Sequence, residues 1–203
     1  MDKHISDDTS GVRGRWTNGL TGYGLVSQAI HWLTALLMVS IVALGLYSSS
    51  LPRAGLRDNV LLVHKSLGLL IIALTVLRLV WMAYSPARSD PARHKPWERH
   101  AARLGHGLLY LILLVMPLSG IVMSSGAGRH ITFFNLFSLP QIMPLNPALT
   151  PHEQYYYQLG KFLHTNVFEW TLYAIFVFHL AGVIKHRVID GHRDTIRRMW
   201  GSR

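Results

Sequence analysis

The composition of this 203-residue chain is typical of a membrane protein rather than of a soluble domain. Half of its residues are hydrophobic and only 15% are charged, whereas soluble domains carry about a quarter charged residues. The formal net charge of +10 would suit nucleic-acid binding only if the basic residues formed one face of a soluble scaffold. They lie instead between apolar runs, as membrane topology predicts, and nucleic acid is therefore excluded as a partner.

In chain order, a polar tail is followed by four apolar runs. Residues 1–22 are expected to form a mobile cytoplasmic tail. The runs predict helices at about 24–47, 59–84, 103–125 and 162–186. Each is close to the ~20 residues that cross a bilayer, and backbone groups in lipid must be paired within the segment. We predict an all-α fold, an integral membrane four-helix bundle over residues 23–190, followed by a basic cytoplasmic tail at 191–203.

The connections between these helices differ in their content of basic residues. The second connection and the two ends of the chain hold most of the Lys and Arg, whereas the first and third connections hold only Arg53, Arg57, Arg129 and Lys161. Positive residues stay on the cytoplasmic side, so we expect both termini to be cytoplasmic. In the third connection, the segment from Phe133 to Leu145 is too short and too broken by proline to span, and its aromatic residues suit the headgroup level.

Histidine is abundant, at 12 residues, in a chain without cysteine. The predicted topology converts sequence position into depth. His31 on the first helix and His179 on the fourth would each lie about two turns from the cytoplasmic end. His64 on the second helix and His164 on the fourth would both lie near the outer end. Because ionisable groups inside a membrane are costly and usually functional, we predict an inner and an outer histidine pair.

The chemistry of these pairs favours haem iron. Two imidazoles would fill both axial positions of a haem, which suits electron transfer, and the lack of cysteine excludes covalent c-type attachment. Zinc or copper would need further ligands, and no cysteine or carboxylate lies at the same depth to complete a set. The alternative without a cofactor is that each histidine bonds to a hydroxyl or carbonyl of a neighbouring helix.

Other polar residues near the runs remain open to more than one interpretation. Arg78 could extend to the headgroups or bind a haem propionate or a quinone carbonyl, and Lys65 could likewise face an anionic species. His186 could be solvated or handle a proton at a quinone pocket. His106 could be interfacial or compete as a metal ligand.

Seven segments carry a resemblance that covers about residues 22–200. They are SQAIHWLTALL (27–37), LLVHKSLGLL (61–70), LTVLRLVW (74–81), MPLSGIVMSSGAGRHITFFNLFSLP (116–140), FLHTNVFEW (162–170), FVFHLAGVIKH (176–186) and DTIRRMW (194–200). In this order and spacing, the chain resembles the bacterial cytochrome b561 family. The resemblance implies a multi-pass protein of the bacterial inner membrane with two b-type haems.

The resemblance also implies which histidines bind iron. His31 with His179 would hold the inner haem and His64 with His164 the outer haem, which makes His106 a non-ligand. One departure is visible, because the two histidines on the last helix usually stand 14 residues apart in the family and here stand 15 apart. The extra residue would rotate His164 by about 100°. A π-bulge absorbs one residue without breaking a helix, and we predict one between His164 and His179.

The resemblance also implies an activity, because the family members to which one is assigned are superoxide oxidases that reduce ubiquinone in the membrane. By this resemblance Lys65, Arg129 and Lys161 would attract the anion at the outer face. Arg78 and His186 would line an inner quinone pocket, and no residue is assigned as catalytic. One alternative is a haem b electron-transfer or anchor subunit of a hydrogenase or formate dehydrogenase complex. An alternative outside redox chemistry is a histidine-bearing membrane transporter.

Overall fold

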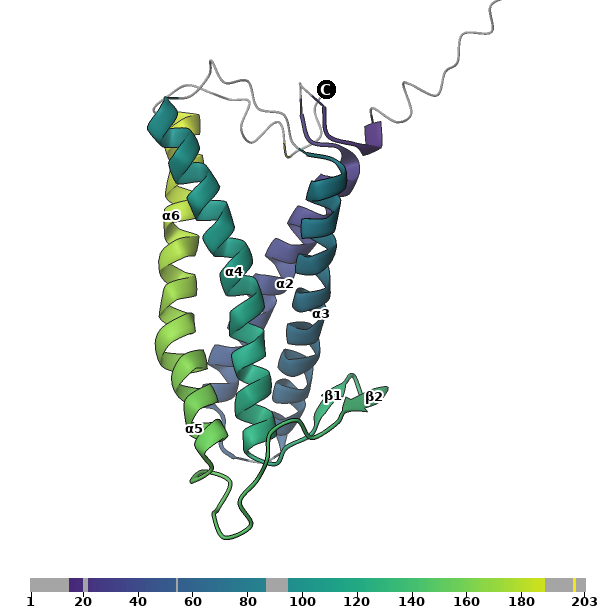
Figure 1. Ribbon diagram of the computed structural model, residues 1–203, viewed down its shortest axis with the longest axis vertical. Coiled ribbons are helices and arrows are strands. Elements are labelled where there is room, and N and C mark those ends of the chain that lie inside the picture. Colours follow the sequence, from purple (N-terminus) through teal and green to yellow (C-terminus); the bar gives the residue numbers. More distant parts are fainter. Residues whose placement is uncertain (1–14, 20–21, 54, 87–94, 189–198, 200–203) are drawn as a thin grey trace, which may run out of the picture.

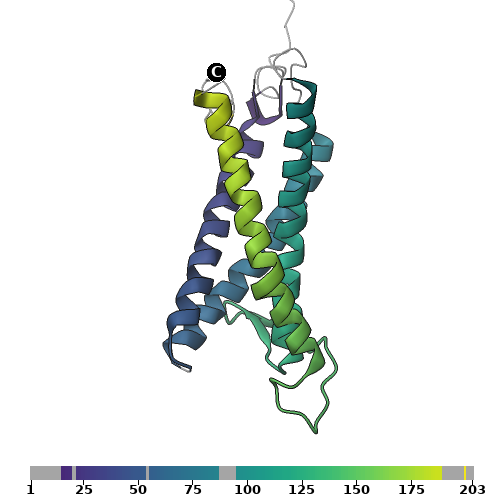
Figure 2. The same ribbon diagram turned by 90° about the vertical axis from the view of Figure 1, so that its left-hand side faces the viewer.

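The computed structural model describes residues 15–19, 22–53, 55–86, 95–188 and 199, without the side chains of residues 186 and 187. Within this part of the chain, long helices run side by side along one axis (Figures 1 and 2). Their bounds are α2 (Leu25–Ser50), α3 (Leu56–Tyr84), α4 (Pro96–Gly126), and a last helix built of α5 (Tyr155–Lys161), η2 (Phe162–Phe168) and α6 (Glu169–Val188). The predicted tails fall largely outside the described residues.

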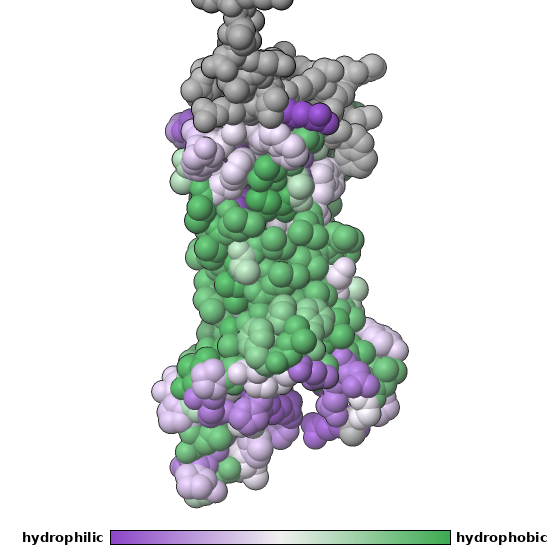
Figure 3. Space-filling view, turned by 90° about the vertical axis from the view of Figure 1, so that its right-hand side faces the viewer, coloured by the Kyte–Doolittle hydropathy of each residue, from purple (hydrophilic) through white to green (hydrophobic). Residues whose placement is uncertain are grey.

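The described helices include four that are long and apolar enough to cross a membrane. Large apolar side chains point away from the bundle: Leu36 is 65% exposed and Phe178 is 76% exposed. Figure 3 shows the resulting apolar surface along most of the length, with polar residues gathered toward the two ends. Lipid in place of water explains why these side chains need no protein partner. The predicted all-α membrane bundle is confirmed.

Two of the helices begin earlier than hydropathy predicts, α4 at Pro96 instead of about 103 and the last helix at Tyr155 instead of about 162. The start of α4 has its own local cause. Pro96 occupies the first turn, where its missing N–H costs nothing, and the Glu98 carboxylate accepts a hydrogen bond from the Lys95 N–H at 3.1 Å. These first turns are polar, so a search for apolar runs does not detect them.

The last helix approaches α4 most closely near its own start. A Cβ on Gly160 would lie 2.4 Å from the Met123 backbone nitrogen, and a Cβ on Gly126 would lie 2.4 Å from the Tyr157 backbone nitrogen. Only glycine permits backbones to touch in this way. This contact fixes the height of the last helix against α4.

A short antiparallel hairpin, which the sequence analysis did not predict, lies beside the first half of α3. Strands β1 (Ile131–Phe133) and β2 (Phe137–Leu139) pair with Ile131 opposite Leu139. Phe134, Asn135 and Leu136 connect the strands; Phe134 and Asn135 have φ of 45° and 58°, and the Leu136 N–H donates to the Phe133 carbonyl at 2.8 Å, which closes the turn. The buried Ser66 hydroxyl of α3 accepts the Phe134 N–H at 2.9 Å. We call this end of the bundle the hairpin end (Figure 1).

The long connection after the hairpin is also held by side chains. The Ser125 hydroxyl accepts the N–H groups of Ile142 and Met143, each at 3.0 Å. Farther along, the hydroxyl and N–H of Thr150 donate to the Glu153 carboxylate, and these hydrogen bonds hold the pKa of that exposed carboxyl below its ordinary value. The loop therefore returns the chain to α5 by a defined path.

Segments from both halves of the chain meet at the opposite end, which we call the Glu98 end. The Asn18 N–H donates to the Ser85 hydroxyl at 2.9 Å, and the Trp32 indole N–H donates to the Met199 carbonyl at 2.9 Å. The described residues nearest the two chain ends thus lie at the same end of the bundle.

Candidate functional site

The predicted outer pair of histidines comes together at the hairpin end. The rings of His64, on α3, and His164, on η2, have centroids 6.2 Å apart with planes at 82°. Two imidazole nitrogens on opposite sides of one metal ion lie about 2 Å from it each. Since each nitrogen lies about 1 Å from its own ring centroid, such a pair places the centroids about 6 Å apart. The observed spacing fits two axial ligands of one iron.

The hydrogen bonds of these rings fix their tautomers. His64 Nδ1 lies 3.0 Å from the Ile41 carbonyl, and His164 Nδ1 lies 2.9 Å from the Met116 carbonyl. A carbonyl can only accept, so Nδ1 carries the proton in both rings and Nε2 carries the lone pair. A metal-binding histidine usually donates its other ring N–H to a backbone carbonyl or a carboxylate in this way. The Ser119 hydroxyl also lies 3.0 Å from His164 Nδ1 and is a second polar neighbour of this nitrogen.

A glycine makes room for each of the two rings. Gly45 follows the Ile41 carbonyl by one helical turn, and a Cβ there would lie 3.1 Å from Cε1 of His64. Gly120 follows the Met116 carbonyl by one turn, and a Cβ there would lie 3.2 Å from Cε1 of His164. Such contacts are tighter than ordinary van der Waals packing. Both outer histidines thus lie in notches of the same design on neighbouring helices.

His164 lies in a π-helical segment, as the extra residue before His179 predicts. The segment η2 spans Phe162–Phe168, and the Glu169 N–H donates to the His164 carbonyl five residues earlier. The prediction of a π-bulge is confirmed, although the segment begins two residues before His164. Because the wider turn absorbs one residue, His164 keeps the facing that a 14-residue spacing would give it.

The predicted inner pair belongs to a cluster to which four helices contribute. Arg78 of α3 lies 2.9 Å from Nδ1 of His31 on α2, and electrostatic interaction links His31 to His179 and His106. The His106 ring on α4 contacts the His179 ring on α6 edge to face, with centroids 5.5 Å apart. Arg78 also lies over the Tyr110 ring, 5.2 Å from its centroid. Arg78 therefore turns into the bundle rather than toward headgroups.

His106 is closer to the inner pair than the family resemblance implies. Its Nδ1 lies 2.6 Å from the Ala102 carbonyl of its own helix, so its Nε2 also carries a lone pair. Within the described residues, groups of three or more His, Asp or Glu side chains that could hold a metal ion do not occur. In the inner site the rings of His106 and His179 are therefore in contact, whereas the contact given for His31 is with Arg78 and its link to His179 is electrostatic.

The remaining candidates divide between the two ends. At the hairpin end, Lys65 interacts electrostatically with Arg129 and with Asp58, and Lys161 is exposed on α5. The side chain of His186 lies outside the described part of the chain, so its predicted role stays a prediction.

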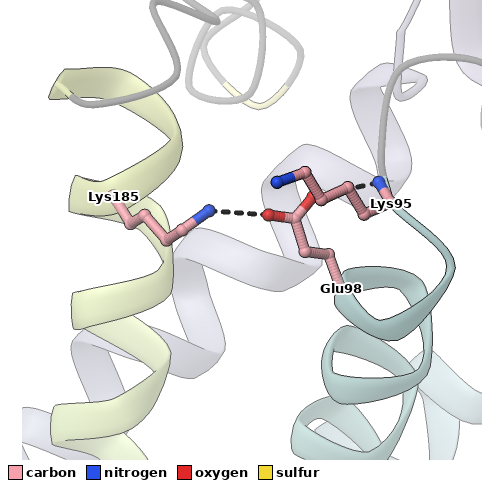
Figure 4. Close-up of polar contacts among 3 residues, drawn as sticks. All are labelled: Lys95, Glu98 and Lys185. Carbon is pink, nitrogen blue, oxygen red and sulfur yellow. Dashed lines mark hydrogen bonds and ion pairs between the residues drawn. The ribbon is translucent and has the colours of Figure 1, made fainter.

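An ion pair holds α4 against α6 at the Glu98 end (Figure 4). Lys185 Nζ lies 2.7 Å from a Glu98 carboxylate oxygen and 5.6 Å from the centroid of the Trp97 ring. The Glu98 side chain is only 11% exposed. Together with the glycine contact at the hairpin end, this pair fixes the two helices that carry His106 and His179.

Comparison with known proteins agrees with this geometry. The family described as prokaryotic cytochrome b561 matches residues 22–202. The chain belongs to the prokaryotic cytochrome b561 family. Its members are membrane electron-transfer proteins that bind b-type haem, so the chain is a multi-pass bacterial membrane protein of this class. The family resemblance stated from the sequence is confirmed.

Individual relatives span nearly the whole chain. The chain is 32% identical over 188 residues to cytochrome b561 homolog 2 of Escherichia coli (strain K12), covering 92% of this chain and 95% of that protein. It is 26% identical over 178 residues to cytochrome b561 homolog 1 of the same strain, covering 84% and 92%. It is 24% identical over 181 residues to the protein named probable superoxide oxidase CybB of Yersinia pestis, covering 87% and 94%.

Several residues of the site were not found by sequence reasoning. Ser119, Tyr110 and the carbonyls of Ile41 and Met116 contact the candidate ligands or Arg78. A carbonyl has no sequence signal, because every residue has one. Ser119 had a weak signal, since it precedes Gly120 in the notch that receives His164.

Proposed function

We propose that this cytochrome b561 is a di-haem oxidoreductase that passes electrons between the outer face and membrane ubiquinone, with superoxide as the donor. The facing rings of His64 and His164 carry the proposal, because their spacing and their Nδ1 hydrogen bonds suit two axial ligands of one iron. His31 and His179 hold the second haem in the inner cluster. Each haem supplies a one-electron carrier inside the apolar bundle.

The last helix sets the separation of the two sites. His164 and His179 stand 15 residues apart on it, which corresponds to about 22 Å of helix rise. The ligands thus hold one haem near each membrane face. An electron that enters at one face can therefore reach the other without a charged group moving through lipid.

The hairpin end is suited to an anionic donor. Lys65 and Arg129 interact electrostatically there, and neighbouring cations raise the local concentration of an anion. Superoxide would give up one electron and leave as O2. Two superoxide anions supply the two electrons that, with two protons, convert ubiquinone to ubiquinol. The name of the Yersinia pestis relative, probable superoxide oxidase, supports this donor.

In this proposal the Glu98 end faces the cytoplasm and holds the quinone site. Most basic residues lie in the segments that join at this end, and positive residues stay inside. Both termini are therefore cytoplasmic in this proposal. Arg78 and His186 line the quinone pocket, where Arg78 donates to a quinone carbonyl or a haem propionate and His186 supplies a proton.

Haem quantitation on the purified chain tests the proposal. We expect two b-type haems per chain in a reduced-minus-oxidised spectrum, and about one in each of His64→Ala and His179→Ala. His152→Ala, in the exposed loop, is the matched control and keeps two. A colourless protein would contradict the proposal and favour a transporter.

Turnover tests the donor and acceptor. The two-haem protein should reduce ubiquinone when superoxide is generated enzymatically, and the product should be blocked by superoxide dismutase. A preparation that holds two haems, does not react with superoxide and always co-purifies with a soluble partner would instead be an electron-transfer subunit of a larger complex.

A further inference from the structure

Glu169 is a carboxylate within the last membrane-spanning helix that the proposed electron path does not use. It is the only Asp, Glu, Lys or Arg between Lys161 and Lys185, and its helix is one of the four that are long and apolar enough to cross a membrane. An ionisable side chain at such a depth is costly and usually functional. We therefore expect this carboxylate to have a role in the bundle.

The π-helix brings Glu169 to the same side as the outer histidine pair. In a regular α-helix, five residues would turn Glu169 by about 140° away from His164. In η2, the Glu169 N–H instead donates to the His164 carbonyl, which closes one wider turn on the fifth residue. Glu169 thus follows His164 on nearly the same side of the helix, and electrostatic interaction links the two side chains.

A tyrosine hydroxyl holds the Glu169 carboxylate. The Tyr173 hydroxyl, one turn farther along α6, donates to Glu169 Oε1 at 2.8 Å, and both side chains are half-buried. A hydrogen bond from a neutral donor stabilises the ionised form of a carboxyl without cancelling its charge. Within the described part of the chain, no Lys or Arg forms an ion pair with Glu169. Its negative charge can therefore act on the neighbouring outer site.

The charge beside the inner pair has the opposite sign. Arg78 lies 2.9 Å from His31 Nδ1 and interacts electrostatically with His179. Because reduction of an iron adds one negative charge, a nearby anion favours the ferric form and a nearby cation favours the ferrous form. Glu169 and Arg78 thus act in opposite directions at two depths of the bundle.

We propose that the Glu169 carboxylate lowers the midpoint potential of the outer haem and thereby favours electron transfer from the outer to the inner haem. In this step one electron leaves the ferrous outer iron, which becomes ferric, and reduces the ferric inner iron, so no further reactant is needed. Glu169 acts through its charge and is not a catalytic residue. This inference rests on the proposed function, and it gives the inward direction of electron flow a cause within the chain.

Redox titration of the haem-loaded protein tests the assignment. In Glu169→Gln, which keeps the shape of the side chain, the midpoint potential of the outer haem should rise while that of the inner haem stays nearly unchanged. A unit charge about 10 Å from an iron, at an effective dielectric constant of about 20, changes the reduction equilibrium about tenfold, which is about 59 mV for one electron. Glu169→Asp, which keeps the charge, should stay close to the wild type.

Two further variants assign the shift. The same titration in the His179→Ala background should show it again, because that variant keeps only the outer haem. Glu153→Gln is the matched control, since it makes the same change at an exposed carboxylate of the long loop, where water and salt screen the charge. It should leave both potentials unchanged. Lys65 and Arg129 remain in every variant, so the shift reports Glu169 alone.

Several results would overturn the assignment. An outer potential that stays the same or falls in Glu169→Gln would show that the carboxyl exerts no negative charge on the iron. Equal shifts of both haems, loss of the outer haem, or an equal shift in Glu169→Asp would show that the side chain supports the structure instead. Any of these results with two haems in the wild-type chain leaves the proposed function standing, whereas a wild-type chain without haem would overturn both.

Discussion

The two outer histidines bind to their neighbouring helices in the same way. Each ring bonds to a carbonyl that already belongs to a helix, Ile41 for His64 and Met116 for His164. A residue four positions later would normally cover that carbonyl with its Cβ, but both positions hold glycine. The glycines therefore orient the rings indirectly, by exposing the acceptor that fixes each tautomer.

Gly45→Ala and Gly120→Ala should each weaken haem binding at the outer site. The added Cβ would lie 3.1 or 3.2 Å from a ring carbon, so the ring must shift and its Nδ1 hydrogen bond must lengthen. Loss of such an orienting contact typically costs about 10- to 100-fold in metal affinity. Haem titration of the purified variants, followed by absorbance, measures this.

Gly107→Ala is the control for the same substitution on the same kind of helix. Nothing lies within 4 Å of a Cβ there, so the variant should bind haem as the wild type does and should gain up to about 1 kcal/mol in helix stability. Equal haem affinity in all three variants would show that the notches do not orient the rings.

At the scale of elements, the sequence predicted the membrane-spanning helices but not the features that depend on tertiary contacts. Four helices follow from apolar length, and the π-helix follows from one residue in excess between two histidines. The hairpin does not follow, because its strands are short and it depends on the Ser66 hydroxyl of a distant helix. The bond from Arg78 to His31 was missed for the same reason, since it depends on how α2 and α3 are rotated against each other.

The π-helix predicts an unusual tolerance to deletion. Removing Asn166, which lies in η2, should convert the segment to regular α-helix and leave the facing of His164 and His179 nearly unchanged. The variant should keep both haems. Removing Val177 from the regular α6 should rotate His164 against His179 by about 100°, and the haem content should fall to about one per chain.

Haem quantitation on the two deletion variants separates these outcomes. Both deletions shorten the helix by one residue and both remove an exposed side chain, so they differ chiefly in the local backbone. If both variants lose haem to the same extent, the π-helix does not accommodate the extra residue between His164 and His179.

At the scale of the whole molecule, the two ends of the bundle carry different residues and segments. The hairpin end holds the outer histidines and the ordered loops, whereas the Glu98 end holds the ion pair between Glu98 and Lys185 and the segments nearest the chain termini. The direction of electron flow depends on which end faces the cytoplasm. Because Lys and Arg are in excess in the segments at the Glu98 end, our proposal has that end face the cytoplasm.

Single-cysteine labelling tests this orientation, and the chain suits it because it contains no cysteine. Ala148→Cys lies in the exposed loop at the hairpin end, and Ala101→Cys lies at an exposed position near the Glu98 end. In intact spheroplasts, a membrane-impermeant maleimide should label Ala148→Cys nearly completely and Ala101→Cys only at background. After permeabilisation both should react, which controls for accessibility. The reverse pattern would place the cations near Lys65 in the cytoplasm, and a periplasmic superoxide donor could then not reach the outer pair.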